Sequence, residues 1–431
     1  MNNNKSLTNL VGAAKATKKL SQFSLLALAC FSANALAESV AITNAEVYTL
    51  ASKGILSNAT VVFDEGKITA VYANDELPEQ LSVDKTIDAK GKVLTPGFIA
   101  SNNLLGLVEV GAVANSRDGA AKKADITFDA SLAFNPMSSL IPYTRKGGIT
   151  TNIVMPKGGD SLFKGQSFAV NLSGDFDSVI ASNNGVIVEL GAKAKGSRAL
   201  TLQKLANTLE DADKKLTAKD SKKKSKKEPK RSEVVVNALL AGEKPLLAKV
   251  DRATDILALL KLKARYQLDL VLVGARDALL VSQDIAKANV PVMISTIDNL
   301  PNSFDSLHGS LTTAAELEKA GVKVIIATSG ESHNINQLRF DAGVAVANGL
   351  EHSSALAAVS ANVADVFKLN SGRISVGKDA DLVLWSNDPF EISTQVDTMW
   401  INGKQVSTKS RQDALRDRYT SESDMPRAYI K

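Results

Sequence analysis

Polar side chains suited to proton transfer follow a predicted strand in the C-terminal part of the chain. The apolar run 322–327 is typical of a buried strand, and a polar cluster comes directly after it. Its members are Ser329, Glu331, Ser332, His333 and Asn334. Histidine exchanges protons near neutral pH, so His333, Ser329 and Glu331 are candidate catalytic residues, with Asn334 as a candidate substrate contact. The alternative is that His333 is an ordinary loop residue.

Two further features could bind or attack a substrate. Arg117 could hold a carboxylate, or it could form an internal ion pair with the adjacent Asp118. Ser329 and Ser332 could act as nucleophiles, but neither lies in a Gly-x-Ser-x-Gly turn and no base can be assigned to them. Arg117 is therefore a candidate for substrate binding, and serine catalysis is the weaker hypothesis.

Histidine is scarce, which limits the metal chemistry that the chain can support. The three histidines are His308, His333 and His352, and no two of them have the short spacing typical of paired zinc ligands. The sequence has no Gly-x4-Gly-Lys-Ser/Thr phosphate loop, no His-Glu-x-x-His pair and no calcium-binding loop. We therefore predict neither a bound metal nor another cofactor.

Strands and helices alternate through the middle of the chain. Strands are predicted at 246–250, 268–273, 290–295 and 322–327, and helices at 253–266, 277–288 and 313–320. Such alternation predicts parallel βα units, and no glycine-rich dinucleotide turn is present, so a TIM-like barrel is favoured over an open sheet. Short strands are expected before and after this unit, which suggests that the two ends of the chain pair. Their ranges are 41–50, 60–63, 67–72, 85–89, 381–385 and 398–402.

The first 37 residues have the pattern of a secretory signal peptide. Three lysines precede an apolar run, 23–31, and small residues at Ala35 and Ala37 permit cleavage after Ala37. The run is shorter than the ~20 residues that span a bilayer, and no later segment predicts a transmembrane helix. Cleavage would remove the only cysteine, Cys30. A cysteine-free mature chain suits an oxidising compartment, and we expect a periplasmic protein.

Residues 211–233 are unusually basic, with ten basic and five acidic side chains. A solvated loop or a frayed helix extension is the simpler interpretation, and contact with an anionic lipid surface is the alternative. Nucleic acid is not an expected partner, because no aromatic residue in this segment could stack on bases. We treat the segment as an insertion.

Three motifs resemble segments of the amidohydrolase superfamily. The sequence KVLTPGFI at 92–99 resembles the segment before the first barrel strand of that superfamily, and GKDADLV at 377–383 resembles the entry into its C-terminal sheet. Between them, KGGITT at 146–151 is similar to a third family segment. The order and separation of these motifs match, and the resemblance extends over nearly all of the mature chain, in particular to imidazolonepropionase-like and dipeptidase-like members.

The resemblance implies an α/β fold, namely a (β/α)8 barrel with a small composite β-sandwich formed by the N- and C-terminal segments. After the signal peptide 1–37, residues 38–95 and 371–408 would form the sandwich and 96–370 the barrel, followed by a polar tail, 409–431. Family members hydrolyse C–N bonds with one or two divalent metals that activate water. A hydrolase of such bonds is therefore implied.

At each family metal-ligand position this chain has a residue of another kind. The family's Asp-x-His-x-His falls on residues 100–104, where Asn102 is a weak neutral ligand and a candidate substrate contact. The fifth-strand histidine falls on Lys249, also a candidate substrate contact, and the sixth-strand histidine falls near Gly274. The catalytic aspartate falls on Ser329. We therefore expect the usual metal site to be degenerate.

Two functions remain open for this chain. The resemblance favours an exported hydrolase of C–N bonds that acts on a small molecule by altered chemistry. The missing metal ligands favour a non-catalytic relative, either a ligand-binding barrel or the partner subunit of an intact amidohydrolase.

Overall fold

The computed structural model describes residues 38–191, 194, 197–221, 228–328 and 332–421. The predicted signal peptide, the candidate residues Ser329 and Glu331, the centre of the lysine-rich segment and the end of the polar tail lie outside the described residues. Within them, no helix is both long enough and apolar enough to span a membrane.

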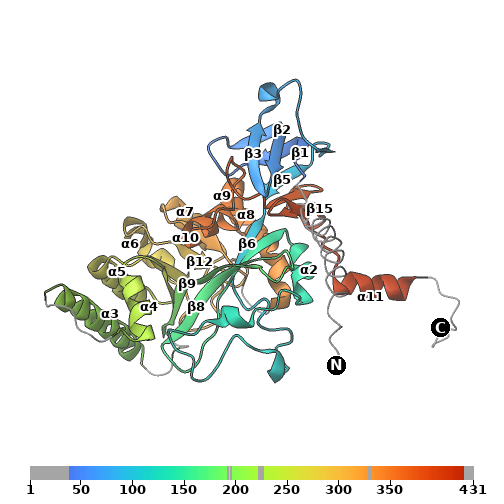
Figure 1. Ribbon diagram of the computed structural model, residues 1–431. Helices are drawn as coiled ribbons and strands as arrows, with labels where there is room; N and C mark the ends of the chain where they lie inside the picture. Colours follow the sequence, from blue (N-terminus) through green and yellow to red (C-terminus); the bar gives the residue numbers. More distant parts are fainter. Residues whose placement is uncertain (1–37, 192–193, 195–196, 222–227, 329–331, 422–431) are drawn as a thin grey trace, which may run out of the picture.

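One of two eight-stranded sheets curls into a half-barrel (Figure 1). In spatial order its strands are β13 (Val324–Ile326), β12 (Val292–Ile294), β11 (Leu270–Gly274), β10 (Leu246–Val250), β9 (Val179–Glu189), β8 (Phe163–Asn171), β7 (Ile149–Val154) and β6 (Phe98–Asn103). Strands β9 to β13 run parallel, as do β6 and β7, whereas β8 is antiparallel to both of its neighbours. The sheet therefore departs from eight successive βα units, because β7, β8 and β9 follow one another without an intervening helix.

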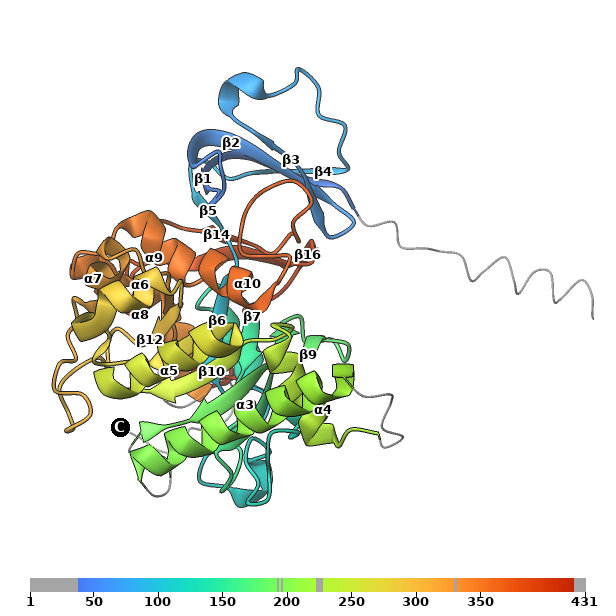
Figure 2. The same cartoon turned by 90° about the vertical axis from the view of Figure 1, so that its left-hand side faces the viewer.

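Nine helices pack around the half-barrel within the described chain, and all but α10 lie outside it. They are α2 (Leu140–Arg145), α3 (Arg198–Ser221), α4 (Arg231–Leu240), α5 (Ala253–Tyr266), α6 (Ser282–Lys287), α7 (Thr313–Lys319), α8 (Leu338–Ala347), α9 (His352–Ala358) and α10 (Ala361–Phe367). In Figure 2, α3, α4 and α5 lie side by side in front of the sheet. The lysine-rich segment 211–233 thus begins within α3 and ends within α4, and of its described residues only 228–230 are not helical.

Local sequence explains why α5 forms where it does. Ile256, Leu259 and Leu260 recur at helical spacing and are buried against the sheet. The helix ends where Gln267 adopts a left-handed conformation, with φ of 53°. The structure confirms the helix predicted at 253–266 and the strand predicted at 246–250.

The inside of the half-barrel is filled by apolar side chains from every strand. One layer consists of Ile99, Ile153, Ala169, Ile187, Leu247, Val271, Met293 and Ile325. Helix α10 packs into the same cluster through Val363 and Phe367. No ladder joins β6 to β13 within the described chain. Instead, the Ile99 N–H donates to the Val359 carbonyl at 2.8 Å, and Asn362 Nδ2 donates to the Val324 carbonyl at 2.8 Å.

The second sheet combines strands from both ends of the chain and lies above the half-barrel in both ribbon views. Its order is β16 (Lys404–Gln405), β15 (Val396–Ile401), β14 (Leu382–Trp385), β5 (Val93–Pro96), β1 (Val40–Tyr48), β2 (Ile55–Asp64) and β3 (Lys67–Tyr72), and β4 (Lys85–Asp88) also pairs with β1. The antiparallel pair of β5 and β14 joins the two ends, so the expected pairing of N- and C-terminal strands is present.

Aromatic rings connect this sheet to the half-barrel. The ring centroids of Phe98 and Trp385 lie 5.4 Å apart, and those of His352 and Phe390 lie 4.9 Å apart. His352 Nε2 also lies 3.0 Å from Asp388 Oδ2, and this hydrogen bond raises the pKa of His352. The histidine at the start of α9 therefore has a structural role at the junction of the two sheets.

Candidate functional site

The carboxyl ends of the half-barrel strands surround a pocket of about 420 Å³. Residues from all eight strands of this sheet, or from the turns beside them, line it, namely Asn102, Lys157, Lys164, Glu189, Lys249, Asp251, Arg276, Ser295 and Ala327, among others. Pockets of this size commonly hold small molecules, and in barrel enzymes this end carries the site. The pocket is therefore the candidate functional site.

A bulge in β6 places Asn102 at the pocket. Pairing with β7 shifts between Ser101 and Asn103, and Asn102 has a φ of 58°. Beyond the bulge, the Asn103 and Asn152 side chains exchange hydrogen bonds of 2.7 and 3.0 Å. Bulges beside functional sites commonly redirect a side chain. Here the bulge brings Asn102 to the pocket wall and fixes Asn103 to the neighbouring strand.

Opposite charges alternate across one side of the pocket. Lys249 and Glu189 are register partners on the parallel strands β10 and β9. Lys164 Nζ lies 3.3 Å from Glu189 Oε2 and donates to the carbonyls of Gly159 and Ser161, each at 2.9 Å. The Lys164 side chain is only 11% exposed. Lys164 is therefore fully bonded and holds the turn between β7 and β8 over the pocket.

A second charged pair lies after β11. Arg276 Nη1 donates to Asn302 Oδ1 at 2.9 Å, and its Nε lies 4.0 Å from Asp251 Oδ1. Gly274 precedes this arginine with a φ of 91°, and a Cβ at this position would lie 2.9 Å from Asp251 Oδ1. The left-handed backbone disfavours a larger side chain here, and the Asp251 carboxylate would have to shift to admit one. A histidine at this point of the sixth family strand would not fit without rearrangement.

The described lining of this pocket is richer in basic side chains than in groups that bind metals. Four of its described lining side chains are cationic (Lys157, Lys164, Lys249, Arg276), and two, Glu189 and Asp251, are anionic. No group of three or more histidine, cysteine or acidic side chains in the described chain is arranged to hold a metal ion. Ammonium and guanidinium groups repel a cation, and metal sites of this kind need converging carboxylate, imidazole or thiolate ligands.

A network of ion pairs fixes the loop after β12 beside the pocket. Asp305 accepts hydrogen bonds from Arg198 Nη2 at 2.5 and 2.6 Å and from Arg252 Nε at 2.6 Å. Burial raises the pKa of Asp305, but these arginines outweigh that effect and lower it. In the same loop, His308 Nδ1 lies 2.9 Å from Asp277 Oδ1. His308 therefore has a carboxylate partner.

The candidate residues from the sequence separate into three groups. Asn102 and Lys249 both line the pocket. Arg117 is exposed in the long loop after β6, and His333 is exposed in the 3-10 turn Ser332–Gln337, which also contains the half-buried Asn334. These three are not among the described lining residues. Their proposed roles stay predictions, as do those of Ser329 and Glu331, which lie outside the described residues.

Several pocket residues were not identified from the sequence. Lys164, Glu189 and Arg276 belong to none of the motifs discussed above. Lys164 had no pattern to indicate it, because its strand mixes polar and apolar residues without regular alternation.

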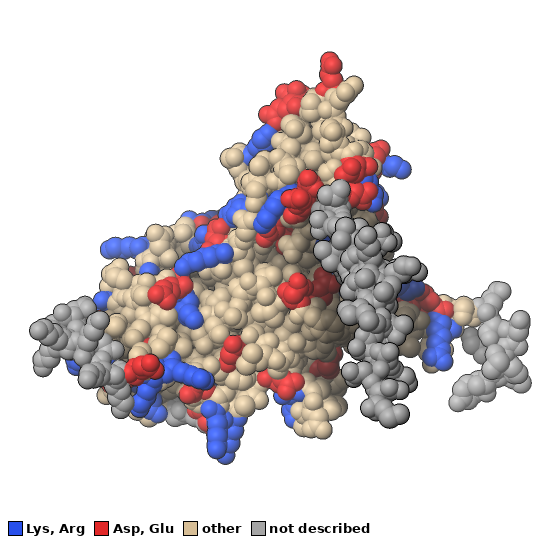
Figure 3. Space-filling view, viewed as in Figure 1, with Lys and Arg blue, Asp and Glu red and all other residues tan. Residues whose placement is uncertain are grey.

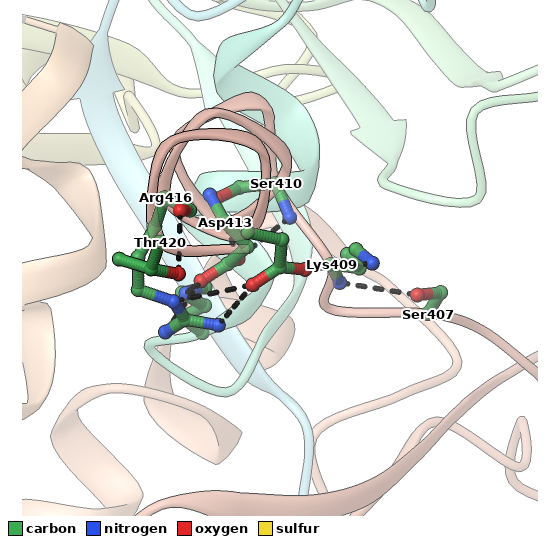
Figure 4. Close-up of polar contacts among 8 residues, drawn as sticks. Ser407, Lys409, Ser410, Asp413, Arg416 and Thr420 are labelled. Atoms are coloured by element: carbon green, nitrogen blue, oxygen red, sulfur yellow. Dashed lines mark hydrogen bonds and ion pairs between the residues drawn. The ribbon is translucent and has the colours of Figure 1, made fainter. Parts of the chain in front are cut away.

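A larger cavity, of about 700 Å³, lies away from the strand ends beneath α11 (Arg411–Thr420). Most of its charged groups are paired with one another, as Figure 4 shows in part. Asp413 contacts Lys146 at 2.7 Å, while Asp417 contacts Lys409 and Arg416, each at 2.9 Å. The Lys146 pair joins α11 to the body of the protein, and the other two are local to the helix and its start. On the face shown in Figure 3, acidic and basic side chains are interspersed.

Comparison with known proteins relates both sequence and fold to amidohydrolases. Residues 252–406 match the amidohydrolase family model. The chain shares the fold of an amidohydrolase from Thermotoga maritima, with a TM-score of 0.76, 24% identity, and coverage of 86% of this chain and 100% of that chain. Molinate hydrolase is more distant, with a TM-score of 0.54, 14% identity, and coverage of 92% and 99%.

A curated relative matches over a shorter stretch. The amidohydrolase tasK of Hapsidospora irregularis is 26% identical over 115 residues, which make up 26% of this chain and 12% of that protein. The chain thus matches only about an eighth of this relative, which is roughly twice as long as the chain itself.

Proposed function

We propose that this chain is a divergent member of the amidohydrolase family that binds a small molecule at the strand ends without a divalent metal. The family match at 252–406 and the shared fold support its membership. The observation that carries the functional part is the charged wall formed by Lys164, Glu189 and Lys249. Lys164 on β8 and Lys249 on β10 place ammonium groups where metal ligands would have to converge.

A ligand-binding role follows from this charge arrangement. Water is a poor nucleophile at neutral pH unless a metal or a base activates it. Two observations support this role: the described pocket lining lacks a converging set of metal-binding side chains, and the left-handed backbone at Gly274 disfavours a larger residue on the sixth strand. The pocket therefore keeps the shape of a small-molecule site while lacking the means of metal-dependent hydrolysis. Such a protein could act alone or as the partner subunit of an intact amidohydrolase.

Hydrolysis of a C–N bond is the second candidate function. The family match supports it, and several proteins that share the fold are named as hydrolases. His308, oriented by Asp277, and His333 are the imidazoles in the loops of the C-terminal half that could move a proton. This function would require water activation by side chains alone.

The finer architecture and the location belong to the same proposal. The half-barrel would correspond to the family barrel, with bounds 96–370, and the second sheet would correspond to its composite sandwich, built from 38–95 and 371–408. Cleavage after Ala37 would deliver the mature chain to the periplasm.

The proposal is tested by metal analysis and by turnover on the same sample. Untagged mature protein, purified without chelator, is analysed by inductively coupled plasma mass spectrometry. It is then assayed with dipeptides, cyclic amides and imidazolones, with and without added zinc. We expect metal far below one equivalent and no zinc-dependent turnover. Stoichiometric metal together with hydrolysis that a chelator abolishes would overturn the proposal.

The matched control for this experiment is a pocket variant that restores metal-binding chemistry. Lys249→His replaces an ammonium by an imidazole on β10 and leaves Glu189 in register beside it. If this variant gains zinc while the parent has none, the ammonium accounts for the exclusion. If both bind equal amounts of zinc, the charge argument fails.

A further inference from the structure

We infer that the buried carboxylate of Asp341 fixes the Ser295 hydroxyl as a hydrogen-bond acceptor toward the strand-end pocket, so that the pocket favours ligands that offer an N–H or O–H group at this point. Because this inference concerns the same pocket, it rests on the proposed function and names the chemical group that the ligand must carry. Asp341 acts through Ser295 and is therefore a positioning residue.

Asp341 lies in the first turn of α8 and holds the chain where it leaves β12. Its Oδ1 accepts hydrogen bonds from Ser295 Oγ at 3.2 Å, from Thr296 Oγ1 at 3.4 Å and from the Ile297 N–H at 3.3 Å. Thr296 Oγ1 also donates to the Asp341 carbonyl. One carboxylate thus fixes the three residues that follow β12, and the first of them, Ser295, lines the pocket.

The Asp341 carboxylate is buried and forms no ion pair with a basic side chain of the described chain. Burial raises the pKa of Asp341 from 3.8 to about 6, because three neutral donors replace only part of the lost hydration. Elements α7, α9, β13 and the turn 332–337 pack against α8, but the charge with the largest effect on Asp341 is Asp298, which raises its pKa further. Arg339, also on α8, bonds to the backbone carbonyls of residues 389, 391 and 394. At neutral pH the carboxylate is therefore mostly ionised and accepts hydrogen bonds only.

The groups of the hydroxyl that are already used decide what Ser295 can offer to a ligand. A serine hydroxyl has one hydrogen and two lone pairs. The hydrogen goes to the Asp341 carboxylate, and one lone pair accepts the Asp298 N–H at 3.4 Å. The second lone pair remains, and it needs an N–H or O–H donor. A ligand that places a carbonyl or carboxylate oxygen here gains no hydrogen bond and is disfavoured.

Protonation of Asp341 reverses this preference. A carboxylic acid can donate to Ser295 Oγ, which frees the serine hydrogen for a ligand. We expect this change as pH falls through about 6, the pKa of the buried acid. Below that pH the pocket offers a donor at Ser295 in place of an acceptor.

A cysteine at position 295 reports the contact with Asp341. The chain has one cysteine, Cys30, so Ser295→Cys in a Cys30→Ser background carries a single thiol. The pH dependence of its reaction with iodoacetamide gives the pKa of the thiol, which is about 8.5 without a neighbour. We expect Asp341→Asn to lower this pKa by at least about 1 pH unit, because no carboxylate then opposes the thiolate. Asp298→Asn is the matched control and should lower it by less than about 0.3, since that carboxylate is exposed and screened.

Thermal unfolding shows whether each variant is folded. Asp341→Ser is a second neutral replacement, used in the same way if Asp341→Asn does not fold. An equal thiol pKa in the parent and in a folded Asp341 variant would mean that the carboxylate does not act on position 295, and would overturn the inference.

Pairs of amides test the ligand group. Small primary amides and their N,N-dimethyl counterparts, which have no N–H, are compared by saturation-transfer NMR at pH 8 with the parent protein and with Ser295→Ala. We expect dimethylation to weaken binding at least about fivefold in the parent and less than about twofold in Ser295→Ala. Binding by none of the amides, or an equal effect of dimethylation in both proteins, would show that the ligand group is wrongly assigned.

The two proposals can fail separately. Stoichiometric zinc in the parent protein contradicts the metal-free site and leaves the thiol result standing. A thiol pKa that does not respond to Asp341 contradicts the positioning role and leaves the metal analysis unaffected.

Discussion

Replacement of the buried Asp381 by asparagine should stabilise this protein at neutral pH. Asp381 lies in the motif before β14 and is 5% exposed. Its Oδ1 accepts the Asn402 N–H at 2.8 Å, and its Oδ2 accepts a long hydrogen bond of 3.4 Å from Thr151 Oγ1. Burial raises the pKa of Asp381 from 3.8 to about 6, because these bonds compensate only part of the lost hydration.

The size of the effect follows from that pKa. A rise from 3.8 to about 6 makes the ionised carboxylate cost about 3 kcal/mol of folding free energy. Because the pKa in the folded state is the higher one, the cost is absent below about pH 4, grows between about pH 4 and pH 6, and is complete above that. An asparagine stays neutral, can still accept the Asn402 N–H and can donate to Thr151 Oγ1. We therefore expect Asp381→Asn to be more stable by about 2–3 kcal/mol at pH 8 and nearly unchanged at pH 4.

The assay is urea unfolding followed by tryptophan fluorescence across this pH range. Trp385 lies in β14, which directly follows Asp381, and Trp400 lies in the paired strand β15. Both tryptophans are buried, so their fluorescence reports unfolding of this sheet. Asp75→Asn, in the exposed turn after β3, is the matched control and should not change the pH dependence. A variant that is less stable than the parent at pH 8, or a difference that does not vary with pH, would refute the electrostatic account.

Three further changes test other features of the structure. His352→Gln should destabilise the protein most at acidic pH, because the pKa of His352 is raised in the folded state. The stabilisation by the protonated imidazole is complete below about pH 6.5 and is lost as pH rises through the folded-state pKa. A difference in urea midpoint that grows with pH would contradict this. Gly274→Ala should lower the free energy of unfolding in urea by about 1–3 kcal/mol, because the φ of Gly274 is 91° and the new Cβ would lie 2.9 Å from a carboxylate oxygen. An unchanged urea midpoint would show that the turn relaxes freely. Lys164→Met should lower the free energy of unfolding by about 2–4 kcal/mol, because it removes an ammonium bonded to two carbonyls and a carboxylate. The same change at the exposed Lys157 should cost less than about 0.5 kcal/mol. Equal costs would mean that Lys164 does not stabilise the fold.

Elements with regular local patterns could be predicted from the sequence. The helix at 253–266 and the strand at 246–250 were located to the residue, because apolar spacing over one segment reflects which face is buried. Strand β8 was missed. Its residues are all buried, yet Lys164 and Gln166 interrupt the apolar run. Both find polar partners elsewhere in the chain, Lys164 at Glu189 and Gln166 at Lys244, which compensate their burial.

The candidate site was only partly predictable for a related reason. Asn102 and Lys249 were identified because they stand at motif-aligned strand positions, and both line the pocket. Arg117 and His333 were chosen for their chemistry alone, and the structure places both on exposed loop segments outside the described pocket lining. Residue type suggests what a side chain can do, whereas the backbone path of its loop determines where it lies.

The sequence by itself determined the α/β class, the alternation of strands and helices in the middle of the chain, and the strands at both ends. These depend on residue type and local periodicity. Tertiary structure alone decided that β8 runs antiparallel, that a bulge turns Asn102 to the pocket, and that Glu189 stands beside Lys249, which is 60 positions later in the chain. Pairing between distant strands sets which charges become neighbours, and no local pattern encodes that register.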